Sequence, residues 1–370
     1  MKVVTAIDSF KGSMTSMEAG FAAAEGIHRV DADAEVQVRP LADGGEGTVE
    51  ALVAGMNGKT EHVKVTGPLG EPVICEYGII ESTKTAVIEM AGAAGITQVP
   101  DEKRNPLYTT TYGVGEVIKD AIEKGCRRFI VGIGGSATND GGVGMLQALG
   151  YAFLDKDGKQ VLPGARGLKD ITEITAAYVI PELAECKFRV ACDVTNPLCG
   201  ELGCSSIYGP QKGATPEMIQ DMDQWLGAYA ELAKERFPKA DAKYPGTGAA
   251  GGMGFAFLTF TDAVLESGIN IVLDETKLED YIKDADLVIT GEGPMGKAPV
   301  GVAKLAKKYG KKVIAFAGAV QRDARACNDA GIDAFFPILR GVVTLEEAMK
   351  NENAKQNLAD TAEQVIRLMK

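Results

Sequence analysis

Short runs of apolar, mostly β-branched residues recur along the chain and predict buried parallel strands. Six runs show this pattern: residues 3–7, 36–38, 129–133, 287–290, 313–317 and 334–338. Several are followed at once by Gly, Asp or Ser and then by apolar residues at helical spacing, as at 17–30, 113–124 and 302–309. Strands that alternate with helices in this way are typical of a doubly wound α/β sheet.

The middle of the chain has a different pattern. Residues 65–89 predict antiparallel hairpins, because Gly67-Pro68 and Gly70 mark turns within an alternating stretch. Residues 246–254 are almost entirely Gly and Ala. These segments interrupt the βα alternation and indicate an inserted domain.

We therefore predict an α/β protein in which a flavodoxin-like, doubly wound parallel sheet domain carries a large inserted second α/β domain. Residues 1–65 and 280–370 would form the first domain, and residues 66–279 the insertion, with the strand at 129–133. The ligand cleft would lie between them. In sheets of this kind, ligands bind beyond the carboxyl ends of the strands, so the loops after each strand carry the candidate chemistry.

Composition and charge narrow the functional classes. The 370 residues carry a formal net charge of −12, which argues against nucleic-acid binding because phosphate backbones require clustered Lys and Arg. The N-terminus does not have the pattern of a signal peptide, and no apolar run is long enough to span a membrane. Seven scattered cysteines without a metal-type pair favour reduced thiols and a cytoplasmic protein.

The chain contains only two histidines, His28 and His62, and both are expected at the surface. A general base in this protein is therefore expected to be a carboxylate or a lysine.

The first candidate loop follows the first predicted strand and reads Asp8-Ser9-Phe10-Lys11-Gly12-Ser13. Backbone amides at the start of the next helix favour an anion, and Lys11 adds a positive charge with Ser9 and Ser13 as hydroxyl donors. The structural alternative is a simple strand-to-helix turn in which Ser13 or Thr15 is the N-cap.

Two further loops place acids among glycines. Asp43 and Glu46 in DGGEGT suit a metal ion or a substrate hydroxyl, although Asp43 could equally cap the following helix. Glu292 in GEG follows the strand at 287–290 and could hold magnesium or a ribose.

A glycine-dense loop follows the strand at 129–133, and it allows close approach of the backbone to a phosphate. It matches neither the Walker pattern nor a dinucleotide fingerprint. Its candidate ligand contacts are Gly134, Gly135, Ser136, Thr138, Asn139 and Asp140, and Lys212 in a later GPQKG segment adds a positive charge.

Asp193 ends another apolar run, in CDVTNP, where it could act as a catalytic carboxylate or simply initiate a turn before Asn196-Pro197. Together the loops supply glycines, acids and a few lysines without a histidine. That inventory suits phosphoryl transfer, in which the protein positions reactants and neutralises charge. It does not suit acyl transfer by a Ser-His pair.

The loops together resemble the bacterial glycerate kinase family over nearly the whole chain. The matching segments are AIDSFKGS, PLADGGEGTVEAL, GIGGSATNDGGVGMLQALG, VACDVTNPLCG, YGPQKGA, GTGAAGGMG, LVITGEG and GKAPVGVAKLAKKYGK. GGSATNDGG together with CDVTNP is highly specific. The resemblance implies a kinase that uses ATP and Mg²⁺ to phosphorylate D-glycerate, commonly giving 2-phosphoglycerate.

On this basis we expect distinct roles for the candidate residues. Asp193 is the first choice for the carboxylate that orients the reactive hydroxyl, and Asp8 the second. Glycerate would be bound by Ser9, Lys11, Ser13 and Asn196, the nucleotide phosphates by the glycine-dense loop and Lys212, and Mg²⁺ by Asp43 or Glu292. The alternatives are a non-catalytic binding protein for small organic acids and a kinase for a related acid such as hydroxypyruvate or tartronate. The oligomeric state, including a homo-oligomer, stays open.

The sequence departs from the family pattern at one point. Family members usually carry several more residues between GEG and GK, whereas GEG at 291–293 is followed here directly by PMGK at 294–297. Either the connection is truly short, or a longer loop is missing between Gly293 and Pro294. We favour the second explanation and expect a break there.

Overall fold

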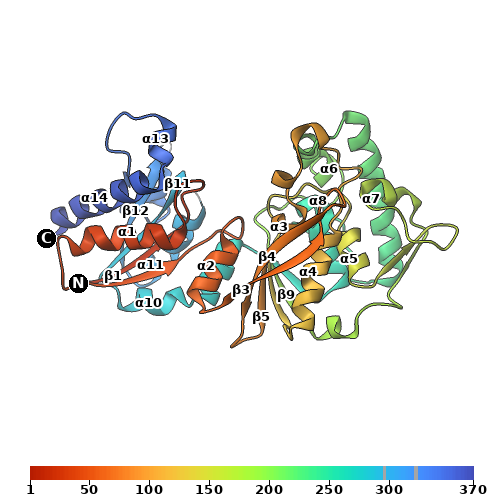
Figure 1. The fold of residues 1–370 in the computed structure, drawn as a ribbon, viewed down its shortest axis with the longest axis horizontal. Helices are drawn as coiled ribbons and strands as arrows, with labels where there is room; N and C mark the ends of the chain where they lie inside the picture. The colour runs from red at the N-terminus through yellow and green to blue at the C-terminus, as the bar shows by residue number, and fades with distance from the viewer. Residues whose placement is uncertain (295–296, 321–323) are drawn as a thin grey trace. The chain divides into compact units, whose positions relative to one another are not determined.

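The computed structural model describes residues 1–294, 297–320 and 324–370, which form two compact units. Unit 1 comprises Met1–Asp43, Glu50–Asn57 and Ile269–Lys370, and unit 2 comprises Gly44–Val49 and Gly58–Gly268. Figure 1 shows both ends of the chain in unit 1. The sequence pattern assigned residues up to 279 to the insertion, whereas unit 1 already resumes at Ile269. Helical spacing alone does not indicate the sheet on which a helix packs.

Unit 1 is a five-stranded parallel sheet with helices. Its strand order is β13-β12-β11-β1-β2, and every neighbouring pair is parallel. Read by position along the chain, this is the flavodoxin-like order 2-1-3-4-5. The elements are β1 (Lys2–Ile7), α1 (Ser16–His28), β2 (Glu35–Pro40), α9 (Gly268–Glu275, whose first residue belongs to unit 2), α10 (Leu278–Asp284), β11 (Leu287–Pro294), α11 (Lys297–Lys308), β12 (Lys312–Ala319), α12 (Ala326–Asp329), β13 (Ala334–Pro337), α13 (Leu345–Met349) and α14 (Asn351–Met369). The predicted fold class and the five predicted strands are confirmed.

Both faces of the three central strands β12, β11 and β1 are buried, which explains why these strands read as apolar runs, whereas the edge strands β2 and β13 are partly exposed. On one face Val3, Leu287 and Phe316 pack with α1 and α14, which lie against each other (Figure 1). On the other face Val288 and Val313 are equally buried, and α11 contacts their strands.

Unit 2 contains a six-stranded mixed sheet of order β10-β9-β6-β5-β4-β3 and a two-stranded ribbon, β7-β8. Strands β10, β9, β6 and β5 are parallel, whereas β4 runs antiparallel to both of its neighbours. The elements are β3 (Lys59–Thr66), β4 (Pro72–Ile80), β5 (Thr85–Glu89), α3 (Ala91–Ala94), α4 (Tyr112–Glu123), β6 (Arg128–Gly132), α5 (Val143–Ala148), β7 (Ala152–Leu154), β8 (Glu173–Thr175), β9 (Lys187–Ala191), α6 (Cys204–Tyr208), α7 (Pro216–Arg236), α8 (Ala249–Phe260) and β10 (Ala263–Glu266), with 3-10 turns η1 (Ile96–Gln98), η2 (Asp101–Lys103), η3 (Ala165–Asp170), η4 (Pro181–Glu185) and η5 (Pro210–Lys212). Helix α2 (Thr48–Gly55) begins in unit 2 and continues in unit 1.

The predicted hairpin is the antiparallel β3–β4 pair. Its turn is closed by the Gly67 amide, which donates to the Glu71 carbonyl at 2.7 Å. Gly70 has φ +89°, a left-handed conformation that glycine adopts without a Cβ penalty. The hairpin prediction is confirmed.

The expected break after Gly293 is wrong for this structure. Strand β11 continues through Gly293 into Pro294, which pairs with Ala319 of β12. Parallel pairing with β12 therefore extends the strand beyond its apolar run, and the short connection is part of this chain. Met295 and Gly296 lie outside the described residues.

Within the described part of the chain, no helix combines the length and the apolar character needed to cross a membrane.

Candidate functional site

The carboxyl edge of the unit 1 sheet carries a buried carboxylate, Asp8. Its amide donates to the carbonyl of Gly291 at 2.8 Å, and its Oδ1 accepts from the Ser9 amide at 2.6 Å. Only 5% of Asp8 is exposed. Burial raises the pKa of Asp8 to about 6, and the nearby Asp43 carboxylate also raises it, while Ser9 and Lys11 oppose the shift. A carboxylate with this pKa is suited to proton transfer near neutral pH.

The raised pKa of Asp8 predicts that Asp8→Asn stabilises the folded protein. The folded state holds this proton more tightly than the unfolded chain, so the charged carboxylate costs stability above about pH 6 and the cost disappears below about pH 4. We expect Asp8→Asn to raise the free energy of unfolding by about 1–3 kcal/mol at pH 7.5 and to leave it nearly unchanged at pH 4. Urea unfolding across this range, with a chelator present, measures the effect.

The exposed Asp33 provides a matched control in the same unit. Asp33→Asn should change stability little at either pH. A lower stability of Asp8→Asn than of the original protein at pH 7.5 would contradict this prediction, because it would mean that the folded state stabilises the charged Asp8 carboxylate.

The loop after β1 presents its basic group outward. Lys11 is exposed, whereas Ser9 and Ser13 are half-buried. The N-cap of α1 is Thr15, not Ser13, and it forms a capping box with Glu18. The buried Ser13 hydroxyl has no hydrogen-bond partner among the described residues, which leaves it for a ligand group.

Asp43 follows β2 and Glu292 lies in the last part of β11 at the same edge, because Ile7 of β1 is in register with both Pro40 of β2 and Gly291 of β11. Within residues 1–294, 297–320 and 324–370, no group of three His, Cys, Asp or Glu side chains could hold a metal ion. Mg²⁺ is usually held by one or two carboxylates together with substrate phosphates. Two carboxylates at this edge fit that requirement.

Glu89 at the end of β5 is a residue that sequence reasoning missed. Burial raises the pKa of Glu89, and the backbone amides of Gly47, Thr48 and Val49 oppose this shift. The Val49 amide donates to its carboxylate at 2.9 Å. The Glu89 carboxylate, rather than that of Asp43, thus accepts a hydrogen bond from the backbone at the start of α2. The only sequence signal for Glu89 was its position as an acid at the end of an apolar run.

Four parallel strands of unit 2 end at one edge, where Gly134 and Gly135 lie exposed after β6. In the part of the chain that the structure describes, neither of their amides donates to a protein acceptor. Gly135 has φ +72°. This loop can therefore offer free backbone donors to an anion.

The remaining candidates of the glycine-dense loop point inward. Ser136, Thr138, Asn139 and Asp140 are all buried. The Asp140 carboxylate accepts from the Thr111 amide at 2.8 Å and from its hydroxyl at 2.9 Å, and burial raises the pKa of Asp140. These side chains are placed to shape the loop from within.

Lys212 reaches the same loop from η5. It is 2% exposed, and its Nζ donates to the Ser136 hydroxyl at 2.7 Å and to the Thr138 carbonyl at 2.5 Å. The structure thus brings Lys212 together with Ser136 and Thr138, which are 76 and 74 residues away in sequence.

The Gly/Ala-rich stretch at the start of α8 packs behind this loop. Ala250, Gly251 and Gly252 all have left-handed backbone angles. A Cβ on Gly251 would lie 2.1 Å from the Thr138 carbonyl oxygen. Glycine is required there by close packing.

Asp193 lies just beyond β9 at the same edge and is exposed. In contrast, the side chain of Asn196 is held by its own segment, because its Nδ2 donates to the Leu202 carbonyl at 2.8 Å and its Oδ1 accepts from the Tyr208 hydroxyl at 2.7 Å. Asp193 is therefore accessible from solvent, and Asn196 is placed to hold the turn.

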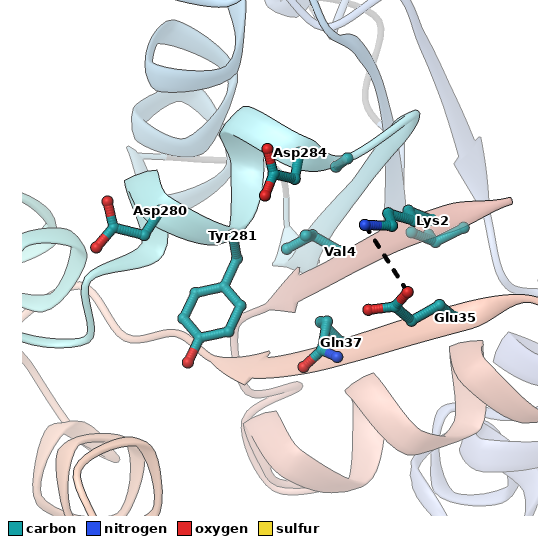
Figure 2. A pocket seen from close by; sticks show the side chains of 9 residues that line it. Lys2, Val4, Glu35, Gln37, Asp280, Tyr281 and Asp284 are labelled. Carbon is teal, nitrogen blue, oxygen red and sulfur yellow. Dashed lines mark ion pairs between the residues drawn. The ribbon is translucent and has the colours of Figure 1, made fainter.

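A hollow of about 270 Å³ opens at the amino edge of the unit 1 sheet (Figure 2). Lys2 and Glu35 form an ion pair of 4.0 Å there, and Tyr281 and Asp284 line the opposite wall. Because ligands of doubly wound sheets bind at the carboxyl ends, we do not place the chemistry in this hollow.

Both histidines are exposed, as predicted. The candidate base thus remains a carboxylate or a lysine.

Comparisons with known proteins agree on one family. The model of the glycerate kinase family matches residues 3–370. A glycerate kinase of Haemophilus influenzae is 50% identical over 375 aligned residues, covering 100% of this chain and 99% of its own. The glycerate 2-kinase of Escherichia coli is 47% identical, covering 98% of each chain. A crystal structure of a candidate glycerate kinase 2 from Salmonella typhimurium superposes with a TM-score of 0.93 at 45% identity, covering 100% of this chain and 98% of its own.

Proposed function

The chain belongs to the glycerate kinase family and is a kinase, and from this premise we propose that it transfers the γ-phosphoryl group of ATP to the 2-hydroxyl of D-glycerate. We choose the 2-hydroxyl because the chain is 47% identical to a glycerate 2-kinase over 98% of both chains. The inventory of exposed amides, buried and exposed carboxylates and a loop lysine supports phosphoryl transfer, because this reaction needs positioning and charge neutralisation.

The exposed loop after β1 suits the carboxylate of glycerate. Lys11 offers a positive charge, and Ser9 and the unpartnered Ser13 hydroxyl offer hydrogen bonds. On the unit 2 edge, the free amides of Gly134 and Gly135 suit the nucleotide phosphates.

Asp43 and Glu292 would hold Mg²⁺, which neutralises phosphate charge during transfer when it is bound. Asp193 is our first choice for the residue that orients the substrate hydroxyl and accepts its proton. Asp8 is the second choice, and its pKa of about 6 supports it.

The function is tested by ADP release with D-glycerate, followed by phosphorus NMR of the product. We expect magnesium-dependent ADP formation and 2-phosphoglycerate. Formation of 3-phosphoglycerate would overturn the proposed regiochemistry, and binding of glycerate without ADP release would identify a binding protein.

Replacing Lys11 by Met should raise the KM for glycerate by about ten- to a hundredfold and change the KM for ATP little. A charge-assisted contact to a carboxylate contributes about 1.5–3 kcal/mol, which corresponds to this range. Steady-state kinetics with each substrate varied in turn measures the change. The exposed Lys308 of the same unit provides the control variant Lys308→Met, and an effect of Lys11→Met confined to ATP would place Lys11 at the nucleotide.

A further inference from the structure

Lys212 is a buried ammonium group without a counter-ion in contact. Lysine is almost never fully buried unless it is paired, because removing its charge from water is costly. Across the described residues, no carboxylate lies within ion-pair distance of its Nζ, and its two acceptors are the neutral Ser136 hydroxyl and Thr138 carbonyl. Because burying the Lys212 charge costs stability, we expect this charge to have a function in the loop that Lys212 contacts.

No titratable group hydrogen-bonds to the Lys212 ammonium among the described residues. Asp140 and the Cys204 thiol are the groups whose charges would raise the pKa of Lys212. Asp140 is engaged by Thr111, and burial raises the pKa of Cys204 to about 11, so that its thiol is neutral near pH 8. The ammonium therefore acts mainly on the loop that it contacts.

Several inward-facing carbonyls of this loop are hydrogen-bonded to segments that pack behind it. The Gly135 carbonyl accepts from the Ile96 amide at 2.8 Å, and the Ala137 carbonyl accepts from the Thr109 hydroxyl at 2.8 Å. The Thr138 carbonyl accepts from Lys212. These contacts hold the loop from its inner side, and the free amides of Gly134 and Gly135 belong to its exposed residues.

We propose that Lys212 is a positioning residue that fixes the phosphate-binding loop from behind through Ser136 and Thr138, and that its charge favours an anion on the outer face without touching it. The inference rests on the proposed function in assigning phosphates to this loop. Charged donors form hydrogen bonds about twice as strong as neutral ones, which explains a lysine where a neutral donor could make the same contacts.

The first test compares Lys212→Met and Lys212→Arg with the exposed control Lys169→Met. We expect Lys212→Met to raise the KM for ATP about ten- to a hundredfold and to change the KM for glycerate less than about threefold. Lys212→Arg, which keeps the charge, should recover at least part of the loss. An unchanged KM for ATP in folded Lys212→Met would overturn the proposal.

The second test uses the unmodified protein and needs no turnover, so it separates this inference from the proposed reaction. Burial lowers the pKa of Lys212 to about 8. The charge should therefore be lost as the pH rises through this value, while the phosphates of ADP stay fully ionised. Calorimetric titration with ADP should show affinity falling about tenfold or more between pH 7 and pH 9.5. A pH-independent affinity would overturn the proposal even if Lys212→Met does not fold.

The third test asks whether Lys212 acts through the loop. If it does, adding Ser136→Ala to Lys212→Met should weaken ADP binding far less than Ser136→Ala does alone, because the contact is already lost. Fully additive effects would show that the two side chains act independently and would overturn the positioning role.

Discussion

Replacing Asp193 by Asn is expected to lower kcat by about a hundred- to ten-thousandfold, the usual contribution of a positioned general base. The carboxylate lies exposed beyond the end of β9, at the edge where the strands of unit 2 present their loops. The substitution is nearly isosteric but removes the group that would accept the proton. Because Asp193 is exposed, the thermal unfolding temperature should stay within about 1–2 °C.

The exposed Asp170 of the same unit provides the control variant Asp170→Asn, which should keep normal turnover. Comparison with Asp8→Asn then decides between the two carboxylates. If Asp193→Asn turns over normally and Asp8→Asn does not, the base is Asp8.

Replacing Gly251 by Ala is expected to destabilise the protein by about 2–5 kcal/mol. Gly251 has φ +66°, and its added Cβ would lie 2.1 Å from the Thr138 carbonyl oxygen and 2.6 Å from the Asn139 Cα. The left-handed backbone costs about 1–2 kcal/mol and forced overpacking another 1–3 kcal/mol. For a unit of this size the sum corresponds to a fall of about 4–20 °C in the unfolding temperature, which calorimetry can measure.

Gly158 offers a matched control, because it has φ +72° but a Cβ added there would meet nothing within 4 Å. Gly158→Ala should therefore show only the backbone cost of about 1–2 kcal/mol. Equal destabilisation by the two substitutions would mean that the contact with Thr138 relaxes freely and that Gly251 does not brace the loop.

Much of the fold could be predicted from the sequence. The apolar runs at the two ends of the chain predicted all five strands of the unit 1 sheet, and the three central strands are apolar because both of their faces are buried. The turn residues Gly67-Pro68 predicted the β3–β4 hairpin, because the conformation of a tight turn depends on its own residues. The strand-end rule likewise indicated which loops to consider, since it depends only on strand direction.

Which residues of the glycine-dense loop lie outward was decided by tertiary structure alone. Gly134 and Gly135 lie outward while Thr138, Asn139 and Asp140 are buried, although all five share one motif. The difference arises because Lys212 and Gly251 pack against Thr138 from distant parts of the chain. Local spacing fixes the period of a strand or a helix, but a loop has no period. The direction of its side chains therefore depends on the segments that pack behind it.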